Sequence, residues 1–122
     1  MKFSKVILAG ILALSFAGAA SAHSVSLSWT ASTDMPTITS GNGYNVYRAS
    51  GACPATGVPT TAAVVNSTVV AAVTYTDSTV TPGAYCYYVE TSLNGAVSVP
   101  SATAQGNVPV APPTNVIITN QQ

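Results

Sequence analysis

Short runs of alternating apolar and polar residues, separated by clusters of Gly, Pro, Asn and Ser, make up most of this 122-residue chain. In SVSLSWTA, residues 24–31, every second side chain is apolar and its neighbours are Ser or Thr. Successive side chains of a strand point to opposite faces, so this run predicts a strand with one buried face. No stretch after residue 22 has apolar residues at helical spacing. Several such short runs with turns between them predict an all-β sandwich or barrel.

The other strands follow from the same alternation. We expect them over YNVYR (residues 44–48), residues 63–66, TYTD (74–77), AYCYYVET (84–91) and residues 96–104. Asn94-Gly95 predicts a hairpin turn, and Pro100 predicts an edge position or a bulge in the last strand. Placing Glu90 in water sets the register of AYCYYVET. The inward side chains are then Tyr85, Tyr87, Val89 and Thr91, and the outward ones are Cys86, Tyr88 and Glu90.

The first 22 residues have the pattern of a secretory signal. Lys2 and Lys5 precede an apolar run over residues 6–18, and Ala20-Ser21-Ala22 offers small residues to a signal peptidase. We expect cleavage after Ala22 and a secreted or periplasmic protein, with a domain over residues 23–104 and a linker and strand-like tail over residues 105–122. The apolar run is shorter than the roughly 18 residues of a membrane-spanning helix, and no longer one follows, so we expect no membrane span.

Charge is sparse after the leader: Arg48, Asp34, Asp77 and Glu90 are the charged residues. One arginine against three carboxylates gives a net charge near minus two. With no basic patch to hold a phosphate backbone, we expect no nucleic-acid partner. So few charges also suit a surface partly covered by neighbours, although an ordinary secreted domain coated with Ser and Thr explains them nearly as well.

Cys53 and Cys86 are the two cysteines of the chain. Export would place them where disulfides persist, so we predict one intrachain bond. It would close a loop of about 34 residues, for which a chain-entropy argument gives roughly 3–4 kcal/mol of stability. Their spacing lacks a CxxC motif, which argues against a metal or redox role.

Three segments together resemble the fibronectin type III family. VSLSWTAS is similar to its second strand, GYNVYRAS to its third, and TYTDSTVTPGAYCYYVET to its fifth and sixth, over about residues 24–104. The resemblance implies a two-sheet immunoglobulin-like β-sandwich with Trp29 in the core between the sheets. It also implies that Tyr85 is the corner tyrosine, whose hydroxyl bonds to nearby backbone. Cysteines are unusual in that family, and its first strand is missing here.

The C-terminal segment APPTNVIIT, residues 111–119, resembles the missing opening strand. Three interpretations stay open: the tail has no structural role, it completes its own sandwich in cis, or it completes a neighbour's sheet in trans. In cis, residues 105–113 span at most about 30 Å. In trans, backbone hydrogen bonds and pocketed side chains would give affinity, so Val116, Ile117 and Ile118 become candidate interaction residues of a head-to-tail homo-oligomer.

A metal site is the main chemical alternative. Cleavage after Ala22 would expose His23, whose amine and ring nitrogen could chelate copper, as in copper proteins with a terminal histidine. Such sites need further ligands, and the chain has no second His. The carboxylates lie in different elements, and no histidine other than His23 is available to activate a serine. We therefore expect no catalytic residues, no metal and no cofactor.

Tyr47 and Tyr88 are predicted to point outward from neighbouring strands. They could form an aromatic patch that binds a protein or a carbohydrate at the cell surface. The alternative is a cross-strand pair that stabilises the sheet by up to about 1 kcal/mol. Together these features predict an exported structural, adhesive or protein-interaction module that is not an enzyme. The alternatives are a head-to-tail assembly subunit and a copper-binding protein.

Overall fold

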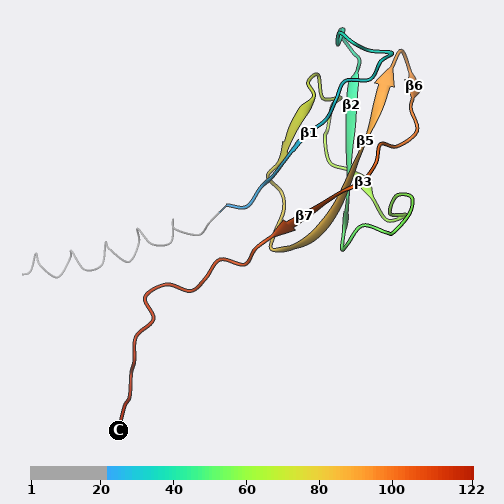
Figure 1. Cartoon of the computed structure of the whole chain (residues 1–122). Coiled ribbons are helices and arrows are strands. Elements are labelled where there is room, and N and C mark those ends of the chain that lie inside the picture. The colour runs from blue at the N-terminus through green and yellow to red at the C-terminus, as the bar shows by residue number, and fades with distance from the viewer. Residues whose placement is uncertain (1–21) are drawn as a thin grey trace, which may run out of the picture. The chain divides into compact units, whose positions relative to one another are not determined.

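The computed structural model describes residues 22–122, which divide into a compact body, His23–Val110, and a separate C-terminal tail, Ala111–Gln122. The predicted cleavage signal lies almost entirely outside the described residues. The body consists of strands joined by turns and loops, with no helix in the part that the structure describes (Figure 1). Its strands form two sheets that pack against each other, which confirms the predicted all-β sandwich.

The smaller sheet has two antiparallel strands, β1 (Val25–Ser28) and β4 (Thr74–Asp77). The larger sheet has five strands. They are β3 (Ala63–Val64), β2 (Gly43–Ser50), β5 (Gly83–Leu93), β6 (Ala96–Val97) and β7 (Ala104–Val108). At the centre of this sheet all eight residues of β2 pair with β5, and β6 and β7 pair with the other edge of β5.

The core lies between the sheets and follows the predicted alternation. Tyr44 and Val46 of β2 and Tyr87 and Val89 of β5 are buried in it. Directly after β1, Trp29 packs its ring edge-on against Tyr44, with 5.3 Å between ring centroids. Trp29 is half-buried and packs against the buried core residues.

Two local predictions from the sequence are confirmed. The Tyr85 hydroxyl donates to the Thr81 carbonyl at 2.9 Å and accepts from the Thr81 amide at 3.1 Å, so it bonds to nearby backbone as expected. Asn94 and Gly95 both have positive φ, 51° and 85°, as a tight hairpin turn requires. This turn joins β5 to β6.

The last strand differs from the prediction of one strand over residues 96–104. It is divided into β6 and β7, because Pro100 has no amide hydrogen and interrupts the ladder. Two serine hydroxyls replace backbone acceptors there. Ser98 Oγ accepts from the Thr91 amide and Ser101 Oγ from the Val89 amide, each at 2.9 Å. The body therefore continues through β7, beyond the predicted boundary at residue 104.

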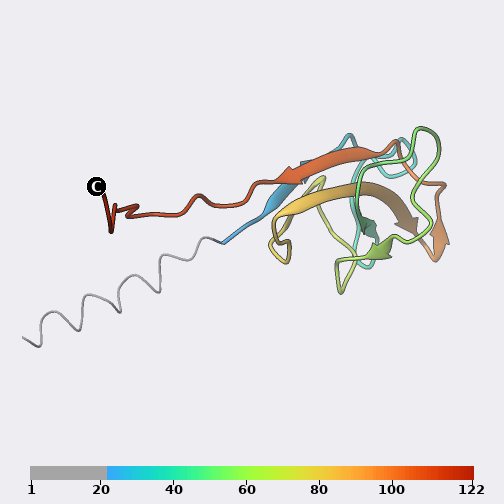
Figure 2. The ribbon, with the colours of Figure 1, turned by 90° about the horizontal axis from the view of Figure 1, so that it is seen from below.

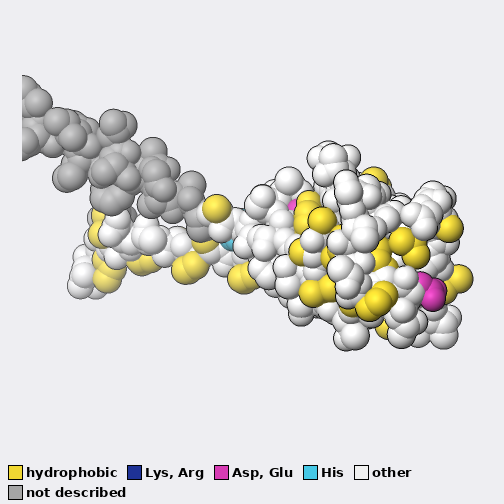
Figure 3. Space-filling model, turned by 90° about the horizontal axis from the view of Figure 1, so that it is seen from above, with side chains coloured by type: hydrophobic (Ala, Val, Ile, Leu, Met, Phe, Trp, Pro, Cys, Tyr) yellow, Lys and Arg dark blue, Asp and Glu magenta, His cyan; other side chains and the backbone are white. Residues whose placement is uncertain are grey.

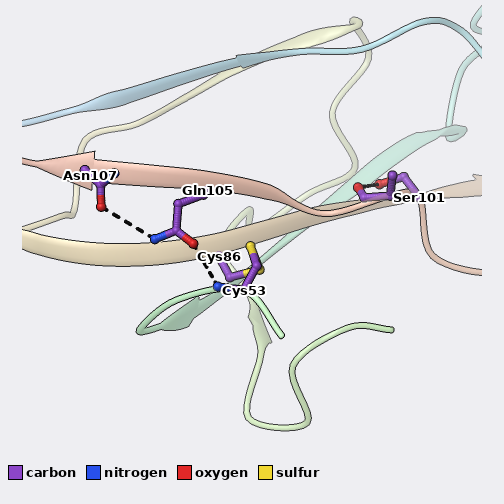
Figure 4. Close-up of a disulfide and its surroundings, with 6 residues drawn as sticks. Cys53, Cys86, Ser101, Gln105 and Asn107 are labelled. Atoms are coloured by element: carbon purple, nitrogen blue, oxygen red, sulfur yellow. Dashed lines mark hydrogen bonds between the residues drawn. A yellow bond between two sulfur atoms is a disulfide. The ribbon is translucent and has the colours of Figure 1, made fainter. Parts of the chain in front are cut away.

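A disulfide joins Cys53, in the loop after β2, to Cys86 on β5, with 4.9 Å between the Cα atoms. The predicted pairing is confirmed. The Cys53 amide also donates to Gln105 Oε1 of β7 at 2.8 Å (Figure 4). The loop therefore reaches across the outer face of β5 from β2 to β7, and Cys86 is fully buried beneath it.

Asp77 is a buried carboxylate that connects the two sheets. It lies at the end of β4 and is 1% exposed. Its Oδ2 accepts from the Arg48 guanidinium of β2 at 2.7 Å and from the Tyr87 hydroxyl of β5 at 2.9 Å. Its Oδ1 accepts from the Thr79 amide and hydroxyl. Burial by itself would raise the pKa of Asp77, but the hydrogen bonds from Thr79, Arg48 and Tyr87 outweigh it and hold the pKa below its ordinary value.

Removing the disulfide is expected to destabilise the body. The Cys53→Ala, Cys86→Ala double variant should lose about 3–4 kcal/mol of unfolding free energy, because the bond restricts a long loop in the unfolded chain. Urea unfolding with and without a reductant measures this. The double variant is the control, because reductant should not affect it. Equal stability of the oxidised and reduced wild-type protein would contradict the structure.

Replacing Asp77 is expected to change both stability and its pH dependence. Asp77→Asn should lower the free energy of unfolding by about 2–4 kcal/mol at neutral pH. The loss should be smaller than for a fully buried ion pair, because the Arg48 side chain is 25% exposed. The pKa of Asp77 is lower in the folded than in the unfolded state. Its stabilisation is therefore complete above the unfolded pKa of about 3.9 and is lost as the pH falls through the folded pKa.

Urea unfolding at neutral and acidic pH measures both effects. The wild type should lose stability below about pH 4, and Asp77→Asn should lose less over the same interval. The exposed Asp34 gives the matched control, because Asp34→Asn should leave the acid dependence unchanged. An Asp77→Asn variant as acid-sensitive as the wild type would contradict this account.

Candidate interaction surface

The outer edge of β1 is open. Among residues 22–122, β1 pairs only with β4. The Trp29 amide donates to the Val73 carbonyl next to β4 at 2.9 Å, so Trp29 directs its backbone groups toward β4. Backbone groups of successive strand residues point to alternate edges, which places the N–H and C=O groups of Ser26 and Ser28 on the open edge. An edge of this kind can accept another strand.

A groove lies beside this edge, between β1 and β7, with a volume of about 240 Å³. Figure 2 shows β1 in blue and β7 in red on the same side of the body. The apolar lining comes from Val25 and Leu27 of β1, Tyr87 of β5 and Ala104 of β7. The backbone of Gly106 completes the wall. A Cβ atom at Gly106 would lie 3.3 Å from the Tyr87 ring and 3.5 Å from Val25, so a larger side chain there would crowd these neighbours.

Neither Gly106 nor the groove was expected from the sequence. One signal was present, because a glycine inside a strand often marks a close approach of neighbouring groups. The position of Val25 opposite Gly106 depends on how the two sheets pack, and alternation within a strand does not contain that information.

The tail, Ala111–Gln122, forms no strand, and its side chains are exposed. Val116, Ile117 and Ile118 are 82%, 75% and 73% exposed. The described structure therefore contains no strand in the tail that could complete the sandwich in cis. Asn115 has a left-handed φ of 55°, so the apolar segment that could extend as a strand begins at Val116. Apolar side chains are visible along the tail in Figure 3.

The predicted pairing of Tyr47 with Tyr88 is present, but the exposed patch is not. The rings stack with 4.8 Å between centroids and 6° between planes. Tyr88 is 9% exposed, because the outer face of β5 is largely covered. Burial raises the pKa of both phenols, and the nearby Glu90 carboxylate raises it further. The pair therefore acts as a cross-strand contact within the sheet.

The three carboxylate side chains of the described part lie in different elements. Asp34 is exposed in a loop, Asp77 is engaged by Arg48, and Glu90 is on β5. Residues 22–122 contain no group of three or more His, Cys, Asp or Glu side chains that could hold a metal ion, so His23 is not part of such a cluster. Within the same residues there is also no helix with the length and hydropathy needed to cross a bilayer.

Comparison with protein-family models finds no match to this chain, and comparison with curated proteins finds none either. Function therefore has to be inferred from the open edge, the groove and the apolar tail.

Shortening the chain tests whether the tail supports its own body. Ending the protein at Val110 should leave the melting temperature unchanged, because residues 111–122 form no strand and are exposed. Thermal unfolding followed by circular dichroism, at a concentration at which the full chain is monomeric, measures this. A clearly lower melting temperature for the shortened protein would indicate completion of the sandwich in cis.

Proposed function

We propose that this chain is an exported, non-catalytic fibronectin type III-like module with a structural or adhesive role, which acts by binding other proteins. The observation that carries the proposal is the apolar tail. Val116, Ile117 and Ile118 are each at least 73% exposed in a protein whose surface has few charges. Contiguous exposed apolar side chains are a typical feature of protein interaction sites.

Three features of the body support the family resemblance. Trp29 packs on the core, Tyr85 bonds to the backbone of Thr81, and β1–β4 faces a sheet centred on β2 and β5. The Cys53–Cys86 bond supports export, because such bonds persist mainly in oxidising compartments.

An assembly subunit is the second candidate function. The specific observation in its favour is the open edge of β1 beside an apolar groove. No specific observation favours the copper-binding alternative at His23.

Export and binding are tested together in the source cells. A photo-crosslinking amino acid replaces Ile117 in the tail, and the matched control carries it at Val64, an exposed residue of β3. We expect an oxidised protein outside the cytoplasm that begins at His23 and forms an adduct with a protein from residue 117 but not from residue 64. A reduced cytoplasmic protein, or the absence of an adduct from residue 117, would contradict the proposal.

A further inference from the structure

We propose that the groove between β1 and β7 is the acceptor site for residues 116–119 of a second copy of this chain, so that copies join head to tail by strand addition. This inference rests on the proposed function and names the partner.

The acceptor offers unused backbone groups. The N–H and C=O groups of Ser26 and Ser28 point to the open edge of β1, which has no partner strand among the described residues. The tail residues from Val116 to Thr119 form no strand, so their own backbone groups are free of any ladder. β1 is four residues long, and the tail segment has the same length. Pairing the two would give both segments the hydrogen bonds of a sheet.

The apolar spacing of the two segments matches. Val25 and Leu27 are two residues apart on the apolar face of β1, and both line the groove. Val116 and Ile118 are also two residues apart, so an extended tail directs both to one face and Ile117 to the other. Gly106 allows the backbone of β7 to approach Val25 and Tyr87 closely, so these groups form the wall that the incoming aliphatic side chains would contact. We therefore place Val116 and Ile118 in the groove and Ile117 outward.

Charge does not oppose this contact. Residues 111–122 contain no charged side chain, and none of the groove-lining residues is charged. Docking the tail therefore removes no ionised group from water, and burial of a charge is the most costly step that strand addition could involve.

The linker favours the groove of a second copy over that of the same body. β7 ends at Val108, and residues 109–113 contain Pro109, Pro112 and Pro113. Each proline fixes its own φ and favours an extended conformation at the residue before it. At about 3.1 Å per residue, a stretch of this composition extends roughly 15 Å from the end of β7. Such a linker resists the tight turn that would bring residue 116 back beside its own β1.

The resulting contact joins two different surfaces, the tail of one copy and the groove of the next. A contact of this kind leaves one free tail and one free groove at the ends of every oligomer. Growth can therefore continue, and the expected products are a ladder of oligomers or a filament.

The test uses the full coding sequence expressed in an exporting host, with the processed protein purified and its mass distribution measured at micromolar concentration. The wild type should form a ladder of oligomers. Val116→Asn with Ile118→Asn should give monomers, because both docked side chains become polar. The matched control, Ile117→Asn, should keep the ladder. A monomeric wild type, or a ladder that survives the double substitution, would overturn the proposal. An equal loss with Ile117→Asn would overturn the assigned facing of the tail.

A complementary variant tests the acceptor. Ser26→Pro removes an amide that points to the open edge and leaves the ladder to β4 intact, so it should block docking. Mixing it with the Val116→Asn, Ile118→Asn protein should produce dimers and nothing larger, because one protein keeps a tail and the other keeps a groove. Monomers in the mixture would overturn joining in trans.

A synthetic peptide of Ala111–Gln122 provides a second readout that does not depend on the folding of Ser26→Pro. It should bind the Val116→Asn, Ile118→Asn protein, whose groove is intact and whose own tail cannot compete. The same peptide with both substitutions should bind at least about tenfold more weakly. Equal binding of the two peptides would overturn the proposal.

The cross-link from residue 117 separates the two proposals. A monomeric wild type that still forms adducts with a different protein in the source cells would overturn head-to-tail joining and leave the proposed function standing. A monomeric wild type with no adduct in the source cells would contradict both the proposed function and head-to-tail joining.

Discussion

The carboxylate of Asp77 is the interaction on which the arrangement of the two sheets depends. It lies on β4 of the smaller sheet and accepts hydrogen bonds from Arg48 and Tyr87, on the two central strands of the larger sheet. A buried charge is tolerated only when it is paired and hydrogen-bonded, so this carboxylate holds β4 at one position relative to β2 and β5. Since β1 pairs with β4, the same contact also determines where β1 lies beside β7.

The two faces of β5 are protected in different ways. Tyr87 and Val89 are buried against the smaller sheet, whereas Cys86 and Tyr88 are buried on the outer face. The Cys53–Cys86 bond fastens the loop after β2 over that face. Because Tyr88 is buried and Tyr47 is half-buried, the aromatic pair is not an open platform. The open edge of β1 and the exposed apolar tail lie away from this face.

The smaller sheet has two strands and the larger sheet has five. The groove between β1 and β7 lies where the smaller sheet ends at β1. The groove, the open edge and the exposed apolar tail are each an aggregation liability when considered separately. Strand addition between copies would cover all three at once. The same physical property, unpaired backbone next to uncovered apolar surface, thus accounts for the proposed binding role and for the proposed partner.

Alternation in the sequence determined the fold class, the inward facing of Tyr85, Tyr87 and Val89, and the hairpin at Asn94-Gly95, because these depend on local strand and turn geometry. The sequence also determined the disulfide pairing, because the chain has two cysteines and one intrachain pair is possible. Tertiary structure alone decided the burial of Tyr88 and the groove at Gly106. Each of these depends on which distant segment lies against a residue, and a pattern of period two carries no information about that neighbour.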